Sequence, residues 1–361
     1  MDTLSYWIGL SRVKGIGPAR LRRLITYFGT AESAWQAPYV DLIAAGLDPR
    51  TAETLITFRQ AYDDSTDRHM IARANAKVLP FTSKDYPPLL RQISDPPPLL
   101  YVRGELLPSD KRAVAFVGTR SATDYGKAMV ARLVEPLVVQ GITIISGLAH
   151  GIDAAAHQAA LRANGRTLAV LPCGIDRVYP TENAPLAAEI LQHGALLTEL
   201  LPGERAERGH FGPRNRIISG LSLGVVVVEA GEKSGALITA DSALEQGREV
   251  FAVPGSPLSA ASAGTNELIR AGATLVTRAE DILDGLGFDR LAAPQPVAST
   301  YIPASEQEKA ILDCLGAAAA LHIDEISYAT HLPTHIVGGL LTVLEVKGAI
   351  RQVGILRYSL A

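Results

Sequence analysis

The hydrophobic and polar residues of this chain are spaced as in helices at its start and as in strands through its middle. In the first part, apolar residues recur every three or four positions, which predicts short amphipathic helices over residues 4–13, 18–29, 31–36 and 49–64. Gly15, Ile16 and Gly17 separate the first two helices, and Pro18 follows, where a helix accepts proline in its first turn. Residues 1–75 are therefore predicted to form a helical module of the helix-hairpin-helix or SAM-like type.

From residue 112 onward, short apolar runs alternate with glycine turns and helical stretches. The predicted strands cover residues 113–118, 142–147, 167–174, 195–200, 224–230, 249–255 and 273–277. Their apolar residues are continuous rather than alternating, which is typical of parallel strands covered by helices on both faces. Residues 76–290 are therefore predicted to form an α/β core with a Rossmann-like, doubly wound, mainly parallel sheet. The proline-rich residues 85–104 are predicted to be a connector, because proline suits neither a helix interior nor a central strand.

The last part of the chain is predicted to be a separate module behind a linker. Residues 291–304 are rich in proline and alanine, a composition typical of linkers. Residues 305–361 follow the order helix, helix, helix, hairpin, which is the order of a winged helix. Its predicted third helix, residues 333–348, carries Lys347 as its only lysine or arginine. We therefore favour a protein-binding or structural role for this module over DNA recognition.

Charge is distributed unevenly along the chain. A formal net charge of −3 argues against a protein that coats nucleic acid through bulk charge. Residues 12–23, however, hold five basic residues and no acidic one. A helix start exposes backbone N–H groups that can bind phosphate, so this turn is a candidate phosphate contact. Its residues are Lys14, Gly15, Gly17 and Arg20. The alternative is that the glycines only form a tight interhelical turn.

The composition indicates a globular protein, with 47% hydrophobic and 20% charged residues. No apolar run approaches the ~18 residues of a membrane span, and the first residues lack the pattern of a signal peptide. Cys173 and Cys314 lie far apart and without metal-ligand spacing, so neither a disulfide framework nor a metal site is expected. The expected compartment is the cytoplasm, without a membrane partner or cofactor.

The carboxyl ends of the predicted strands are rich in glycine and small hydroxyl residues. Ligands of open parallel sheets bind beyond these ends, so the site is predicted there. The chain has no G-x-G-x-x-G after the first strand, no G-x-x-x-x-G-K-[ST] and no G-x-S-x-G around Ser146 or Ser234. These absences argue against NAD binding, P-loop ATP hydrolysis and the usual hydrolase nucleophile.

Two sets of polar residues allow an enzymatic interpretation. His150, Asp153 and His157 could hold a metal, but Asp153 is also placed to cap a helix, with His157 packed beneath the glycine turn. Glu199 and Glu229 could act as an acid/base pair, or could bind loop N–H groups and pair with Arg214 or Arg216. In both cases we favour the structural interpretation.

The remaining candidates at the carboxyl ends of the strands, which form the rim of the sheet, make up a basic, hydrogen-bonding set with one aromatic residue. They are Arg120, Phe211, Arg214, Asn215, Arg216, Lys233, Ser234 and Gly235. Arginine binds phosphate bidentately, and an aromatic ring stacks on an unpaired base, so the set predicts single-stranded nucleic acid as the ligand. The alternatives are core packing for Phe211 and internal salt bridges for the arginines. We expect Arg120→Ala or Arg214→Ala to weaken binding without unfolding the protein.

Eight stretches of residues 80–285 closely resemble motifs of the DNA-processing protein A (DprA/Smf) family. They are GTR, YG, SGLAHGIDAAAH, TLAVLPCGID with VYP, FGPRNRIISG, VVVVEA with EKSGALITA, VFAVPG and GTNELIRAGA. The resemblance implies a dimeric, non-catalytic protein of natural transformation that binds and protects incoming single-stranded DNA and helps to load the recombinase RecA. It also implies DNA contacts for Arg120, Phe211, Arg214 and Asn215, and adds Ser146 and Gly147 to the candidate DNA-binding residues.

The chain departs from the family pattern at a few positions. Gly212 stands where relatives often have proline, Thr198 where they often have serine, and Ala236 where a hydroxyl residue is frequent. The loop of residues 203–210 mixes two glutamates with two arginines, so the cation that contacts DNA there stays open. The alternative function is a nucleotide-processing enzyme of the phosphoribohydrolase type, whose P-G-G-x-G-T phosphate loop is broken here at residues 254–257.

Overall fold

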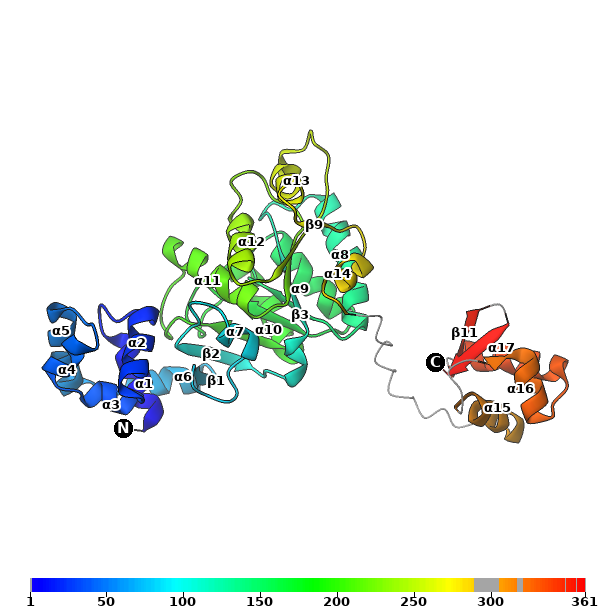
Figure 1. Ribbon diagram of the computed structural model, residues 1–361, viewed down its shortest axis with the longest axis horizontal. Helices are drawn as coiled ribbons and strands as arrows, with labels where there is room; N and C mark the ends of the chain where they lie inside the picture. Colours follow the sequence, from blue (N-terminus) through cyan, green and yellow to red (C-terminus); the bar gives the residue numbers. More distant parts are fainter. Residues whose placement is uncertain (1, 289–304, 317–320, 348, 355, 361) are drawn as a thin grey trace. The chain divides into compact units, whose positions relative to one another are not determined.

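The computed structural model describes residues 2–288, 305–316, 321–347, 349–354 and 356–360. It divides into two compact units, Met1–Asp289 and Arg290–Ala361 (Figure 1). The predicted linker, residues 291–304, lies outside the described residues. The boundary at residue 75 stays a prediction, because the first unit contains both the N-terminal helices and the sheet.

The first unit begins with six short helices. They are α1 (Thr3–Arg12), α2 (Pro18–Phe28), α3 (Ala31–Gln36), α4 (Tyr39–Ala44), α5 (Pro49–Ala61) and α6 (Ser65–Arg73). The first three and α5 confirm the helical spacing seen in the sequence, whereas α4 and α6 were not predicted. Trp7, Leu24 and Leu55 are buried in one apolar cluster with Tyr101 of the sheet. Burial of apolar surface therefore joins these helices to the core.

The sheet has nine strands in the order β1-β2-β6-β5-β4-β3-β7-β8-β9. The strands are β1 (Ala76–Pro80), β2 (Leu99–Gly104), β3 (Ala113–Val117), β4 (Thr143–Ser146), β5 (Thr167–Val170), β6 (Ala195–Thr198), β7 (Gly224–Val227), β8 (Glu249–Ala252) and β9 (Thr274–Leu275). From β6 to β9 all neighbours are parallel, with Val114 opposite both Ile144 and Gly224. The mainly parallel sheet is therefore confirmed.

The prediction that residues 85–104 are only a connector is wrong. Residues 99–104 form β2, which pairs antiparallel with β1 and β6 inside the sheet, and Pro88–Arg91 forms the short helix α7. The prolines at 96–98 end just before the strand, so each residue from Leu99 onward keeps the N–H that a ladder requires.

Helices cover both faces of the sheet, as the continuous apolar strands predicted. α8 (Asp124–Val139), α9 (Ile152–Arg162) and α14 (Ala279–Gly285) pack in one apolar cluster with β3, β4 and β8. α11 (Arg208–Gly220) and α12 (Gly235–Glu245) pack in another, together with α7. α10 (Ala184–His193) packs against the cluster of the N-terminal helices, and α13 (Ala263–Arg270) follows β8. The fold is Rossmann-like and doubly wound.

The second unit has the predicted helix, helix, helix, hairpin order. Its helices are α15 (Glu306–Gly316), α16 (Ile323–Thr330) and α17 (Thr334–Val346), with strands β10 (Leu321–His322), β11 (Ile350–Gly354) and β12 (Arg357–Leu360). Ile311, Ile326 and Leu341 are buried in its own core. Nζ of Lys347 lies 3.1 Å from Oε1 of Glu308, so this cation is engaged within the unit. No helix in the described ranges is both long and apolar enough to cross a membrane.

Candidate nucleic-acid site

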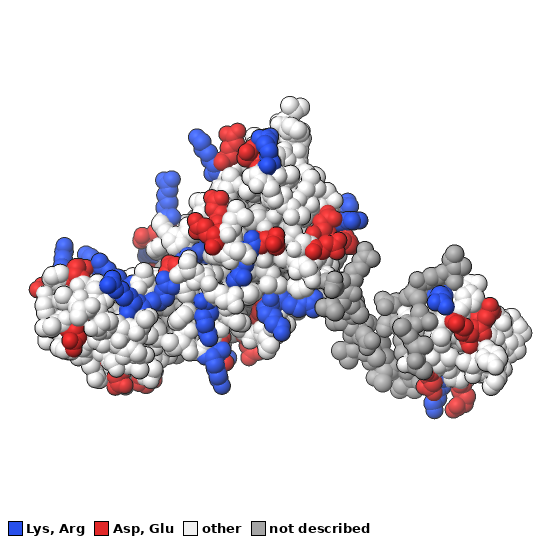
Figure 2. All heavy atoms as spheres, viewed as in Figure 1, with Lys and Arg blue, Asp and Glu red and all other residues white. Residues whose placement is uncertain are grey.

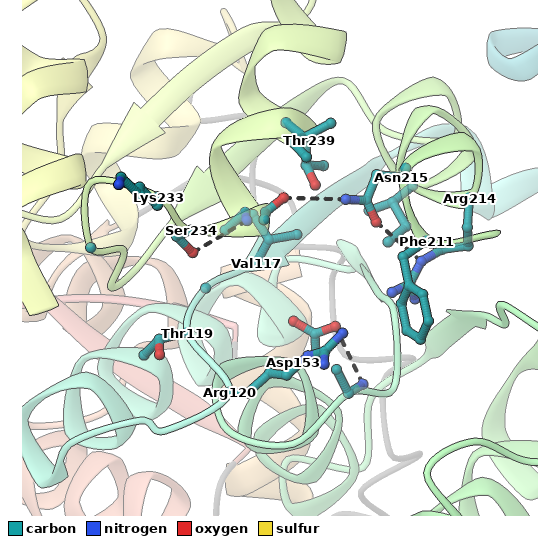
Figure 3. Close-up of a pocket in the computed structure, with 18 residues that line it drawn as sticks. Val117, Thr119, Arg120, Asp153, Phe211, Arg214, Asn215, Lys233, Ser234 and Thr239 are labelled. Carbon is teal, nitrogen blue, oxygen red and sulfur yellow. Dashed lines mark hydrogen bonds between the residues drawn. The ribbon is translucent and has the colours of Figure 1, made fainter. Parts of the chain in front are cut away.

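A pocket lies at the topological switch point of the sheet, where the connections on either side of β3 run in opposite directions. β3 lies between β4 and β7, so the loops that follow β3 and β7 leave on opposite faces. The pocket has a volume of about 470 Å³ and is lined by the end of β3, by the loops that follow β3, β4 and β7, by α11 and by the start of α12 (Figure 3). The structure brings together seven of the predicted residues in this lining. They are Arg120, Phe211, Arg214, Asn215, Lys233, Ser234 and Gly235.

Two exposed cations and an aromatic ring lie at the pocket. Arg120 and Lys233 are exposed, and within the described residues neither has a carboxylate within ion-pair distance. Cζ of Arg120 lies 5.0 Å from the centre of the Phe211 ring, which is partly exposed. The guanidinium thus lies over the ring in a cation–π contact. The pair brings together a cation for a phosphate and an aromatic ring for a base.

The start of α12 adds hydrogen-bond donors to the pocket. The hydroxyl of Ser234 caps the helix by accepting from the N–H of Ala236 at 3.3 Å. Gly235 is exposed, and a Cβ at this position would meet no atom within 4 Å. The N-terminus of an 11-residue helix therefore faces the pocket, where its dipole favours an anion.

Arg214 lies deeper than Arg120 and is engaged inside the protein. Arg214 is only 6% exposed, and its Nη1 donates to the carbonyls of Gly147 at 2.6 Å and Val170 at 2.7 Å. Its Nε donates to Oδ1 of Asn215 at 3.1 Å, and Nδ2 of Asn215 donates to the carbonyl of Gly235. Burial lowers the pKa of Arg214, while the charge of nearby Asp153 opposes that shift. Arg214 thus ties β4, β5 and α11 together beneath the pocket.

Ser146 and Gly147 are buried and support the site from below. The hydroxyl of Ser146 donates to the carbonyl of Phe116 at 2.6 Å. The N–H of Gly147 donates to Asp153, and a Cβ at Gly147 would lie only 1.8 Å from Nη1 of Arg214. Glycine is therefore required here so that the guanidinium can approach the backbone.

Arg216 faces away from the pocket lining. Its Nη2 donates to Oε2 of Glu199 at 2.6 Å, and its Nε lies 3.5 Å from Asp95, which also binds Arg22 at 2.5 Å. For Arg216 the structure therefore shows the internal salt bridge that the sequence analysis gave as the alternative to a phosphate contact. The shared carboxylate of Asp95 links α11 to α2.

The second rim carboxylate, Glu229, also has structural partners. Its two oxygens accept from the backbone N–H of Thr123 at 2.9 Å and from the Thr123 hydroxyl at 2.5 Å. These bonds fix the turn that begins α8. Glu199 and Glu229 thus have the partners that the structural interpretation predicted.

The residues His150, Asp153 and His157 do not converge on one point. No group of metal-ligating side chains occurs among the described residues. Asp153 accepts from the N–H groups of Gly147 and Ala149, and the capping position of α9 belongs to Gly151, so the predicted cap is wrong. Asp153 lies one residue inside the helix, where its carboxylate fixes the preceding loop.

The burial of His157 predicts a loss of stability in mild acid. The ring is fully buried, its Nδ1 lies 2.7 Å from the Thr167 hydroxyl, and desolvation lowers its pKa to about 3. The unfolded chain binds a proton near pH ~6.5, so the stabilisation is complete above that pH and is lost as pH falls toward 3. Between pH 7 and pH 5 the free energy of unfolding should fall by about 2 kcal/mol more in the wild type than in His157→Leu. Urea unfolding at both pH values measures this, and equal losses would contradict it.

The N-terminal turn is held partly by its own basic residue. Arg20 donates to the carbonyl of Gly15 at 2.9 Å and pairs with Asp48 at 2.9 Å. Gly15 has a φ of +97°, which favours glycine. Gly17 caps α2 without a side-chain bond and is exposed, as is Lys14. Lys14 and the start of α2 are the parts of this turn that remain open to an anion.

Two residues near the pocket were not singled out from the sequence. Thr239 lines the pocket from α12, one turn beyond its start. Tyr179 lies beside Phe211, with ring centres 5.6 Å apart. For Tyr179 the sequence did carry a signal, because it lies in the VYP segment that follows the predicted strand of residues 167–174.

A family model described as DNA recombination-mediator protein A matches residues 77–287, and a model described as the DprA winged helix domain matches residues 292–354. Protein Smf of Synechocystis sp. is 41% identical over 288 residues, which cover 78% of this chain and 72% of the relative. The DNA processing protein DprA of Bacillus subtilis is 48% identical over 210 residues, which cover 58% of this chain and 71% of the relative.

Solved structures of the same family share the fold. The X-ray structure of DNA processing protein A from Streptococcus pneumoniae matches with a TM-score of 0.70 and 34% identity, over 79% of this chain and 98% of that chain. The Helicobacter pylori protein, whose structure concerns its single-stranded DNA binding mode, matches with a TM-score of 0.53 and 32% identity, over 58% of this chain and 95% of that chain. Since the first family model spans more than half of the 361 residues, this chain belongs to the DNA recombination-mediator protein A family.

Proposed function

We propose that the chain binds single-stranded DNA in the pocket between the ends of β3 and β7. The observation that carries this proposal is the exposed Arg120 beside the ring of Phe211, with Lys233 at the same pocket. The single-stranded DNA binding of the Helicobacter pylori relative supports it. Stacking needs a base that is free of a partner, so the ring favours a single strand over a duplex.

The predicted site residues divide into two roles in this proposal. Direct contacts come from residues that are exposed or partly exposed at the pocket or at its helix start, namely Arg120, Phe211, Lys233, Ser234 and Gly235. Positioning comes from residues whose polar groups bond inside the protein, namely Ser146, Gly147, Arg214, Asn215 and Arg216. Lys14 and the start of α2 are proposed as an additional phosphate contact.

The family and this site support a specific biological role. The chain acts as a recombination mediator that protects incoming single-stranded DNA and promotes RecA loading during natural transformation. It works as a non-catalytic homodimer in the cytoplasm, without a metal or cofactor. Its partners are the DNA strand and RecA.

No observation favours the alternative of a nucleotide-processing enzyme. The loop that would hold the phosphate is closed by Asn266, whose side chain accepts from the N–H of Gly255 at 3.2 Å and donates to its carbonyl at 3.0 Å. That N–H is therefore engaged and does not point freely at an anion.

A salt titration of the full chain tests the proposed ligand. Affinity for an oligo-dT strand should exceed affinity for a duplex of the same length by at least roughly tenfold, because only the free strand can stack on Phe211. Log affinity should fall linearly with log salt, with a slope of roughly −0.7 for each phosphate bound. Fluorescence anisotropy measures both quantities. Equal affinity for the two DNA forms would refute the proposed ligand, and release of free base from a nucleoside monophosphate would favour the enzyme.

A further inference from the structure

A second aromatic ring lies just outside the pocket. Tyr179 follows β5 in the loop that leads to α10, and it is 41% exposed. Its ring centre lies 5.6 Å from that of Phe211, and the two ring planes meet at 73°. Phe211 belongs to the pocket lining and Tyr179 does not. The pocket, Phe211 and Tyr179 therefore follow one another in space.

The loop that carries Tyr179 is fixed to the segments around the pocket. Asn183 donates to the carbonyl of Leu148 at 2.8 Å, which ties the loop to the turn after β4. Oδ1 of Asp176 accepts from the N–H of Gly203 at 2.8 Å, which ties it to the segment that precedes α11. Tyr179 and Phe211 thus belong to segments that are held together, yet Tyr179 stays 41% exposed.

We propose that Tyr179 is a second nucleobase subsite, on which the base next to the one at Phe211 stacks. This inference rests on the proposed function of the pocket. Bases that lie on both rings cannot remain parallel to each other, because the rings meet at 73°. The strand must therefore turn between these two nucleotides, a geometry that the parallel stacked bases of a duplex cannot adopt. The pair of rings selects single-stranded DNA and sets the path of the strand, from the pocket toward the β5 loop.

The first test uses substitutions in the full chain. Tyr179→Ala should weaken binding of a short oligo-dT by roughly 5- to 100-fold, the range for loss of one stacked base, whereas Tyr179→Phe should bind like the wild type. The matched control is Tyr39→Ala in α4, which removes a tyrosine of similar exposure, 37%, and should leave affinity unchanged. Because Tyr179 and Tyr39 are both exposed, we expect all three variants to unfold at the same urea concentration as the wild type.

The second test separates stacking from support of Phe211. Single thymidines of the short oligo-dT are replaced in turn by abasic sites. At one position the abasic site should weaken binding to the wild type but leave binding to Tyr179→Ala unchanged, because that variant lacks the ring on which the base stacks. 5-Iododeoxyuridine at that position should photo-crosslink to Tyr179. If Tyr179→Ala weakens binding but every abasic effect persists, the ring only positions Phe211 and the inference is overturned.

The outcomes distinguish the inference from the function on which it rests. If the wild type fails to bind oligo-dT, the proposed function fails, and the subsite fails with it. If the wild type binds, Phe211→Ala weakens binding and Tyr179→Ala does not, only the second subsite is overturned.

Discussion

Replacing Arg214 with alanine is expected to lower the free energy of unfolding by roughly 3–5 kcal/mol, the usual cost of leaving a buried charge without its partner. The guanidinium is buried, and its loss would leave the carbonyls of Gly147 and Val170 without a donor. It would also leave Asp153, whose pKa burial already raises, without the charge that opposes that shift. Urea unfolding at pH 7 measures the change. From the sequence we expected Arg214→Ala to weaken binding without unfolding the protein. From the structure we expect it to destabilise the protein.

Two variants control this prediction. Arg120→Ala removes an exposed arginine at the same pocket and should change stability by no more than about 0.5 kcal/mol. The double variant Arg214→Met with Asp153→Asn removes both buried charges and should recover part of the loss, because neither charge is then left alone. If Arg214→Ala unfolds at the same urea concentration as Arg120→Ala, the guanidinium does not hold the strand ends together.

The parallel core was predictable from sequence because burial on both faces leaves a continuous apolar run. β3 and β7 are fully buried, and neither strand contains a polar side chain. β2 was missed because the prolines at 96–98 masked a strand that starts only after them. α4 and α6 are short, and their stability comes from packing on neighbours rather than from a strong periodic pattern.

The position of the candidate site was also predictable, but the depth of each residue in it was not. Strand ends of a parallel sheet meet at one edge, so Arg120, Phe211 and Lys233 could be placed together from the order of the strands alone. Arg120 and Arg214 look equivalent in the sequence, yet one is exposed and the other is 6% exposed. That difference arises from tertiary packing of α11 on β4 and β5. The contact of Tyr179 with Phe211 joins segments 32 residues apart and has no periodic signal.

Arg120→Ala should weaken binding of single-stranded DNA by roughly 10- to 100-fold. A hydrogen bond to a charged group contributes about 1.5–3 kcal/mol, which corresponds to this range of affinity. Arg120 is exposed and has no carboxylate partner within the described residues, so its guanidinium is available to a phosphate. The slope of log affinity against log salt should also decrease by the contribution of about one phosphate.

The matched control is Arg162→Ala, which removes an exposed arginine in the last turn of α9, whereas the first turn of that helix lies at the pocket. The central claim, that the pocket beyond β3 and β7 holds a single strand, is tested most directly by the equilibrium affinity of Arg120→Ala for oligo-dT beside this control. We predict a loss of at least roughly tenfold for Arg120→Ala and wild-type affinity for Arg162→Ala. Wild-type affinity in both variants, or an equal loss in both, would contradict the placement of the DNA in this pocket.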